Sequence, residues 1–176
     1  MIPIPDNAIQ LYSGGFFDYE NPQVDYIDEI DIAYSLGMQC RFAGHCDEFY
    51  SVAQHSVLVS EMIEPEFALH GLLHDAAEAY VNDIPSPLKR LMPEYKAMED
   101  KVWRVISEKF NLPFIMPLEV KVADIRMGLT EKRDLLKPGY HWGCYEDQYE
   151  PYEMVIHPLS PAVAAEEFMD RLYDLL

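Results

Sequence analysis

The chain has 176 residues, of which 49% are hydrophobic and 25% are charged, proportions that are ordinary for a globular domain. It carries 13 basic and 31 acidic residues, and this net charge of −18 disfavours nucleic-acid binding because a polyanion would be repelled. The sequence contains no long apolar span and no signal-peptide pattern, so we expect a cytoplasmic protein with no membrane partner.

Proline and N-cap residues divide the chain into segments with helical patterns. In chain order, we expect helices over about 28–36, 51–63, 65–80, 86–92, 93–110, 117–136 and 160–175. Strand signals are weak, and the aromatic segment 138–158 reads as a loop with room for a short hairpin. The pattern predicts an all-α protein, a helical bundle forming a single domain over residues 1–176.

Three cysteines, an odd number without a Cys-x-x-Cys spacing, indicate reduced thiols rather than a disulfide scaffold. Cys40 and Cys46 could ligate a metal together with His45, but their six-residue step is unusual for a zinc site. We expect ordinary thiols here.

The dipeptide His74-Asp75 lies in a predicted helix that is dense in leucine and alanine. On a continuous helix His70, His74 and Glu78 would share one face, at i, i+4 and i+8. Burying unpaired carboxylates is costly, and a metal ion would neutralise them. The alternative is a solvated groove with no ligand.

Two further polar residues lie on apolar helix faces. Asp124 has Val120 and Met127 as neighbours, and His55 lies between Val52 and Val59. Each has a structural alternative: an ion pair with a lysine or arginine for Asp124, and a satisfied core histidine for His55. Together with the dipeptide they make two imidazoles and two carboxylates from three predicted helices. This donor set suits Co, Mn, Zn, Fe or Ni, with Mg less favoured.

The ordered set His55 … His74-Asp75 … Asp124 resembles the signature of the HD-domain phosphohydrolases. It is similar above all to the small 5′-deoxynucleotidases of the YfbR type, and also to the phage dATP triphosphohydrolases of the DatZ type. The likeness extends to the surrounding stretches HDAAEAYVNDIPSPLK and KVADIRM and covers about residues 28–136. This motif-bearing core is followed by the 138–158 loop and by a C-terminal helix over 160–176.

The resemblance implies that His55, His74, Asp75 and Asp124 are metal ligands. It also implies that Glu78 and Asp83 act on the attacking water, that Arg41 and Lys89 bind phosphate, and that Phe42 lines the base or sugar pocket. Candidates from position alone are His45, close to Arg41, and Lys121 and Arg126, which flank Asp124. Most of the basic residues from 121 to 137 are expected to lie on a solvated helix face, paired with Glu119 and Glu131.

The expected activity is divalent-metal-dependent removal of phosphate from deoxynucleoside monophosphates. One alternative is release of triphosphate from a deoxynucleoside triphosphate such as dATP, with Mg as a possible second ion. Another is a non-catalytic nucleotide-binding module that keeps the fold. The expected partners are a small deoxynucleotide and further copies of the chain in a homo-oligomer.

Overall fold

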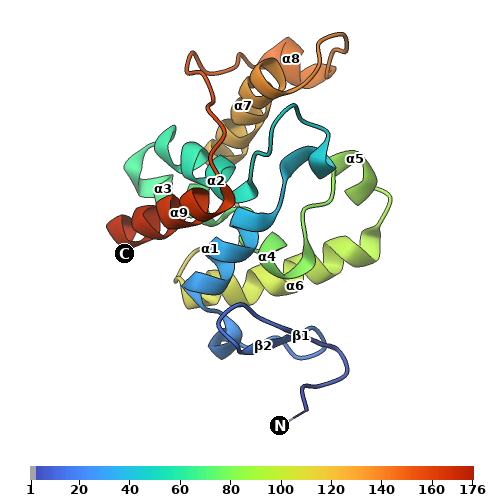
Figure 1. Cartoon of the computed structure of the whole chain (residues 1–176), viewed down its shortest axis with the longest axis vertical. Helices are drawn as coiled ribbons and strands as arrows, with labels where there is room; N and C mark the ends of the chain where they lie inside the picture. The colour runs from blue at the N-terminus through green and yellow to red at the C-terminus, as the bar shows by residue number, and fades with distance from the viewer. Residues whose placement is uncertain (1–2) are drawn as a thin grey trace.

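Helices make up most of this chain and determine where its functional side chains lie (Figure 1). The computed structural model describes residues 3–176. Its helices are α1 (Glu29–Met38), α2 (Val52–Glu61), α3 (Ala68–Leu73), α4 (Glu78–Val81), α5 (Ser86–Lys89), α6 (Pro93–Lys109), α7 (Leu118–Leu135), α8 (Cys144–Gln148) and α9 (Pro161–Leu175). Short 3-10 turns, η1 (Val24–Tyr26), η2 (Arg41–Gly44) and η3 (Pro65–Phe67), join some of them. The prediction of a mainly α single-domain bundle is confirmed.

Capping explains where several helices begin. The side chain of Ser51 accepts a hydrogen bond from the amide of Gln54 at the start of α2, and Ser160 accepts one from Val163 at the start of α9. Such caps satisfy amide groups that the first turn of a helix leaves free. The helix starts predicted from these serines are therefore confirmed.

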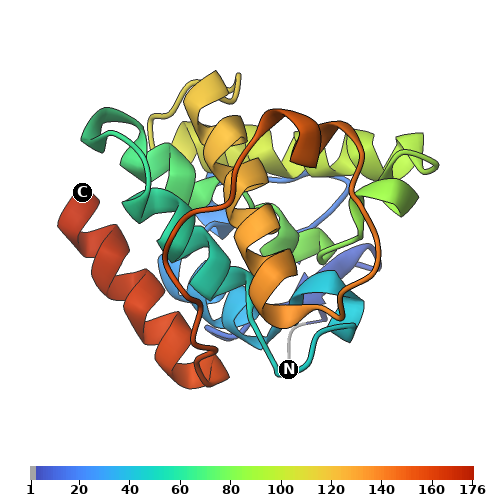
Figure 2. The ribbon, with the colours of Figure 1, turned by 90° about the horizontal axis from the view of Figure 1, so that it is seen from above.

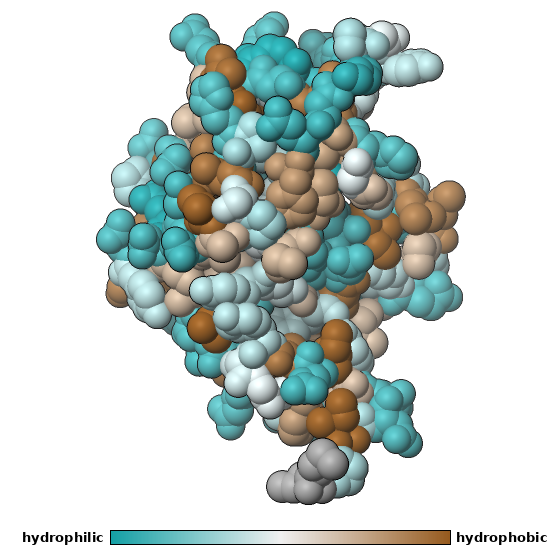
Figure 3. All heavy atoms as spheres, viewed as in Figure 1, coloured by the Kyte–Doolittle hydropathy of each residue, from teal (hydrophilic) through white to brown (hydrophobic). Residues whose placement is uncertain are grey.

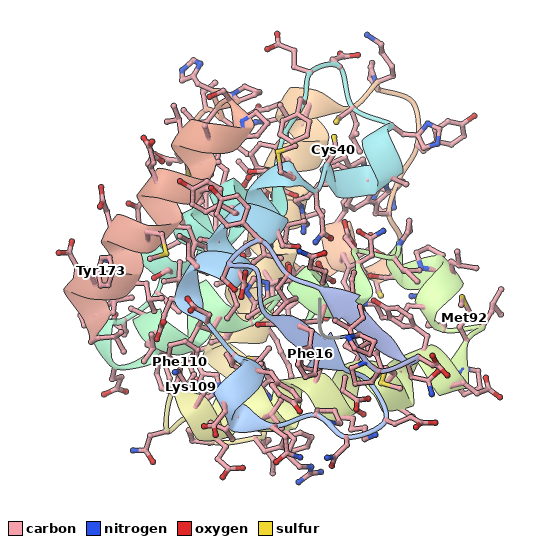
Figure 4. All side chains as sticks on the ribbon, turned by 60° about the horizontal axis from the view of Figure 1, so that its bottom comes forward. Phe16, Cys40, Met92, Lys109, Phe110 and Tyr173 are labelled. Carbon is pink, nitrogen blue, oxygen red and sulfur yellow. The ribbon has the colours of Figure 1, made fainter. Side chains whose placement is uncertain are left out.

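A small antiparallel hairpin precedes the helices and was not predicted. Strand β1 (Ala8–Gln10) pairs with β2 (Phe16–Asp18), with Ile9 opposite Phe17. Phe17 is fully buried against Tyr80, with ring centroids 4.5 Å apart, whereas Phe16 lies on the partly exposed side of the strand (Figure 4). The hairpin lies at the opposite end of the molecule from α8 (Figure 1).

The apolar side chains form two clusters. The larger cluster joins α1, α2, α3, α6 and α9 and includes Leu36, Leu72, Ile106 and Phe168. The smaller cluster lies between α2 and α7 and comprises Tyr50, Val59, Ala123, Met127, Leu135 and Ile156. Helix α2 contributes to both clusters, so it lies at their junction.

Helices α1 and α9 approach closely at Gly37. A Cβ atom at this position would lie 2.8 Å from the carbonyl oxygen of Pro161 and 3.0 Å from Cβ of Ala165. Gly37 lies inside α1, which ends at Met38 rather than at the expected residue 36. The outer face of α9 is exposed at Tyr173, which points away from the body of the molecule (Figure 4).

The prediction of one continuous helix over 65–80 is wrong. The segment forms η3, then α3, then a turn over 74–77, and then α4. Nδ1 of His74 lies 2.7 Å from the carbonyl oxygen of Gly71, the acceptor that a continuous α-helix would give to the amide of Asp75. Two backbone bonds of the turn have 3-10 spacing: the amide of Ala76 donates to the carbonyl of Leu73, and the amide of Glu78 donates to the carbonyl of Asp75. The turn therefore reorients the side chains on either side of it.

The segment 138–158 passes over α7 (Figure 2). Within it lies α8, and no strand forms there among residues 138–158, so the possible hairpin is absent. Arg133 Nη1 donates to the carbonyl of Tyr152 at 2.8 Å, and Gln54 Nε2 donates to that of His157 at 2.8 Å. Hydrophilic residues cover much of the upper part of the face in Figure 3. No helix within residues 3–176 is long and apolar enough to cross a membrane.

Candidate metal centre

Four side chains from three helical segments converge at the junction of the two apolar clusters. His55 comes from α2, His74 and Asp75 follow α3, and Asp124 comes from α7. Nε2 of His55 lies 3.3 Å from Nε2 of His74 and 3.2 Å from Oδ1 of Asp124. Oδ2 of Asp75 lies 3.2 Å from Nε2 of His74 and 3.7 Å from Nε2 of His55. The sequence-predicted ligand set is therefore assembled in space.

The spacing of these atoms fits a divalent ion. Ligands about 2.0–2.1 Å from a tetrahedral ion lie roughly 3.3 Å from one another, which is close to the separations above. His55, His74 and Asp124 each offer one ligand atom, and these three atoms all lie within 4.8 Å of one another. Asp75 is close to both histidines and completes a set of mixed nitrogen and oxygen donors that suits Zn, Mn, Co, Fe or Ni.

Both imidazoles are oriented through their other nitrogen. Nδ1 of His55 lies 2.5 Å from Oε1 of Glu131, and Nδ1 of His74 lies 2.7 Å from the carbonyl oxygen of Gly71. Hydrogen bonds of this kind place the proton on Nδ1 and leave Nε2 free for an ion. Each Nε2 is the atom that faces the convergent site.

The histidine pKa values reflect the acids around them. Burial alone would lower the pKa of His74, but Asp75 and Asp124 outweigh burial and hold it well above its ordinary value. Burial and Arg41 oppose a charge on His55, yet Glu131 and Asp124 raise its pKa as well. Because protons and a metal ion compete for the same nitrogen, metal binding here would strengthen as the pH rises.

Glu131 is the main residue that the sequence reasoning missed. Its side chain is completely buried, so the expectation of a solvated partner for a neighbouring lysine or arginine is wrong. Nε and Nη2 of Arg41 each lie 3.0 Å from Oε2 of Glu131, while Oε1 contacts His55. Its place seven residues after Asp124, two turns along the same helix face, was the signal that could have found it.

Arg41 is held beside the ligand atoms by this contact. Nη1 of Arg41 lies 3.6 Å from Oδ2 of Asp75. Burial would lower the pKa of Arg41, but the carboxylates of Glu131 and Asp75 outweigh it and raise the pKa. The arginine reaches the site from η2, where Phe42 and Ala43 have the left-handed φ angles of 57° and 51°. Such strained backbone is typical of functional sites.

Glu78 lies next to the ligands with one oxygen unpaired. Its Oε1 lies 3.3 Å from Nζ of Lys89, whereas Oε2 is buried and has no hydrogen-bond partner among the described residues. Burial, reinforced by Asp75 and Asp83, raises the pKa of Glu78 well above its ordinary value. Lys89 also contacts Oε1 of Glu99 at 2.6 Å. A buried acceptor without a partner is what a bound water or substrate would satisfy.

Asp83 is fixed by its backbone. Its amide donates to Oε1 of Gln39 at 2.9 Å, and burial raises the pKa of its carboxyl group. The charges of Arg41 and Asp75 also act on this carboxyl group, which places it in the surroundings of the site.

A cavity of about 450 Å³ opens from the ligands. Its lining includes His74, Asp75, Glu78, Lys89, Lys121 and Asp124. Six other predicted residues do not line this cavity. Three of them, Arg41, His55 and Asp83, lie around the ligands as described above, and the other three are Phe42, His45 and Arg126. Phe42 packs near Trp142, with their ring centroids 6.2 Å apart. His45 is exposed. Arg126 donates a hydrogen bond to the carbonyl of Glu150 at 2.9 Å.

His70 does not join the ligands as the continuous helix implied. Its Nε2 lies 3.0 Å from the carbonyl oxygen of Pro113. Cys40 and Cys46 lie with their Sγ atoms 3.5 Å apart, and within residues 3–176 they belong to no metal-binding group.

Comparison with known proteins gives two relatives and no matching family model. Over 168 residues the chain is 49% identical to the Escherichia coli (strain K12) protein named "Uncharacterized protein YfdR", covering 95% of this chain and 94% of that protein. It is 32% identical over 124 residues to an uncharacterized protein of Rhodobacter capsulatus, covering 65% of this chain and 63% of that protein. Neither name states an activity.

Proposed function

The chain belongs to the family of the Escherichia coli protein YfdR, and because that name states no activity, we propose a function from the chain's own site. We propose that it is a divalent-metal-dependent phosphohydrolase of the HD type, which removes the 5′-phosphate from a deoxynucleoside monophosphate. The deoxynucleotide rests on the sequence resemblance, and the hydrolytic chemistry rests on the geometry described above.

One observation carries this proposal. Four ligand atoms with the spacing of a bound ion lie beside Glu78, whose buried Oε2 has no partner among the described residues. A purely structural ion would need no such acceptor next to it. A divalent ion held by His55, His74, Asp75 and Asp124 supplies a Lewis acid for the phosphoryl group.

The chain's own residues account for the other steps. In its deprotonated form, which a cation bound beside it would favour against the effect of burial, Glu78 would accept the proton of the attacking water at Oε2. The sequence resemblance assigns Asp83 to orienting that water. Arg41, held by Glu131, and Lys89 stabilise the negative charge that develops on the phosphoryl oxygens.

The charge of the cavity favours a monophosphate over a triphosphate. Among its lining residues, Lys89 and Lys96 are already paired with carboxylates. Lys121 is the remaining lysine of the lining, set against acidic residues such as Glu99 and Asp100. A triphosphate carries several more negative charges than this lining neutralises. Release of triphosphate from dATP is the competing activity, and the reaction product separates the two.

Replacing Asp75 by alanine tests the proposal. We expect the purified variant to lose both its bound ion, measured by elemental analysis, and the release of inorganic phosphate from dAMP with Co²⁺ or Mn²⁺. Asp100→Ala is the matched control, because Asp100 lines the same cavity and contacts Lys96 rather than the ligands; it should keep its metal. Full phosphate release by Asp75→Ala would overturn the mechanism, and intact triphosphate from dATP would indicate the competing activity.

A further inference from the structure

One part of the cavity is not used by the catalytic proposal. There it is bounded by α6 and by the segment that joins α6 to α7, through Trp103, Phe114, Ile115 and Met116. These apolar side chains, here called the apolar wall, face the same cavity as the ligands His74 and Asp124.

The apolar wall is held in place from three sides. Trp103 Nε1 donates to the carbonyl of Phe114 at 2.8 Å, and His70 Nε2 lies 3.0 Å from the carbonyl of Pro113. The guanidinium of Arg104 lies 4.5 Å from the centroid of the Phe114 ring. The segment is therefore positioned by specific contacts, one of which comes from α3, the helix that leads directly into the ligand pair.

Despite this support, part of the apolar wall is exposed, although Trp103 is buried. Phe114 is 38% exposed and Ile115 is 79% exposed. An apolar surface that is fixed by polar contacts and lines a cavity beside convergent polar groups is typical of a ligand site. In a chain with a net charge of −18, it is also a surface that an uncharged organic group can approach without repulsion.

We infer that the apolar wall holds the base of the substrate, an inference that rests on the proposed function. With the phosphate at the ligand end, the nucleoside extends along the cavity and its base contacts Phe114 and Ile115. This differs from the position that the family resemblance implies, because Phe42 does not line the cavity and packs instead toward Trp142.

The two tryptophans of the chain allow a direct test. Trp103 belongs to the apolar wall, and Trp142 lies near Phe42. In Trp142→Phe protein the fluorescence reports on the wall, and in Trp103→Phe protein it reports on the Phe42 side. We expect dAMP to change the emission of Trp103, and that of Trp142 to stay constant. The reverse pattern overturns the inference.

Affinity gives a second, independent measurement. Phe114→Ala should weaken dAMP binding, measured by calorimetry, at least about fivefold, since stacking of a base on an aromatic ring contributes about 1–3 kcal/mol. Leu91→Ala is the control, because Leu91 is 78% exposed and does not line the cavity; its affinity should match that of the unmodified protein. Metal content should be unchanged in both.

The outcomes separate this inference from the proposed function. If Phe42→Ala weakens dAMP binding and Phe114→Ala does not, the base does not lie on the apolar wall and the inference is wrong. The inference is also wrong if the unmodified protein does not bind dAMP. If dAMP binds with the expected dependence on Phe114 but no phosphate is released, the wall is supported and the hydrolytic function fails.

Discussion

Glu131 shows how one buried carboxylate can serve two functional side chains. It contacts Nδ1 of His55 and the guanidinium of Arg41 from a position with no solvent exposure. His55 and Arg41 both oppose the effect of burial and lower the pKa of Glu131. Glu131 therefore stays charged, and it couples the orientation of a candidate metal ligand to that of a proposed phosphate-binding group.

Glu131→Gln tests this coupling. The amide keeps the shape but removes the charge, which leaves Arg41 buried beside a neutral group. We expect metal affinity, measured by calorimetry, to fall about 10- to 100-fold, and the free energy of unfolding to fall by about 3–5 kcal/mol. Glu119→Gln, at an exposed position on the same helix, should change neither. An unchanged metal affinity in Glu131→Gln would show that His55 does not need this partner.

Glu78 is expected to lower the free energy of unfolding at neutral pH, although the proposed function needs it. Because its pKa is raised in the folded protein, the folded state keeps a proton that the unfolded chain releases above about pH 4.3. Stability therefore falls as the pH rises from there through the raised pKa.

Glu78→Gln removes that loss. At pH 7.5, thermal unfolding of the metal-free variant should show stabilisation of about 1 kcal/mol or more, since a difference of one in pKa corresponds to about 1.4 kcal/mol. The gain should shrink toward pH 4, and phosphate release should be lost. Glu108→Gln, on an exposed face of α6, is the control. A destabilised Glu78→Gln protein at pH 7.5 would contradict this account.

The sequence pointed to the candidate ligands because each was a polar residue at a position where its neighbours were apolar. Asp124 beside Val120 and Met127 is the clearest case. Glu131 was not predicted as a site residue because Lys132 and Arg133 follow it directly and suggested a solvated stretch. In the structure those two basic side chains turn toward Glu146 and Asp134, and Glu131 turns inward. Adjacent residues on a helix point in different directions, so local composition was a poor guide.

At the level of elements, local signals predicted helix starts well and helix continuity poorly. Serine caps and prolines act through the first turn alone, so their effect is readable from sequence. At the break after α3, Nδ1 of His74 contacts the carbonyl oxygen of Gly71, and no helix propensity encodes that contact. The hairpin of β1 and β2 was missed because its three-residue strands are stabilised by a distant partner, Tyr80.

Two glycines in helices should respond oppositely to alanine. Gly37→Ala places a methyl group 2.8 Å from a backbone carbonyl of α9, and we expect a loss of about 1–3 kcal/mol. Gly128, in α7, has open space at the same position, with no neighbouring atom within 4 Å among the described residues. Gly128→Ala should therefore gain about 0.5–1 kcal/mol from helix propensity. Chemical denaturation measures both, and equal effects would show that α1 and α9 do not pack as described.

On the scale of the whole molecule, the candidate metal centre joins two parts of the hydrophobic interior. His55 and His74 belong to elements of the larger cluster, while Asp124 belongs to α7, whose side chains build the smaller cluster. An ion bound to all of them would connect α7 to the rest of the bundle.

Hydrogen exchange should reveal this connection. Adding Co²⁺ to metal-free protein should slow the exchange of amides in α7 more than that of amides in α1 and α9. Helices α1 and α9 are already held by the larger cluster without the ion. The Asp75→Ala protein should show no such difference. Equal slowing in every helix would mean that the ion stabilises the fold as a whole.

If a bound ion holds α7 to the rest of the bundle, the lifetime of the protein depends on the supply of that ion. A ligand that binds only the folded state adds about 2.7 kcal/mol at a hundredfold excess over its dissociation constant. Without the ion, partial opening of α7 would expose Met127 and its apolar neighbours, and proteases act on such open forms. When the proposed metal ion is scarce, we expect the protein to be degraded as well as inactive, so that its abundance follows the availability of that ion.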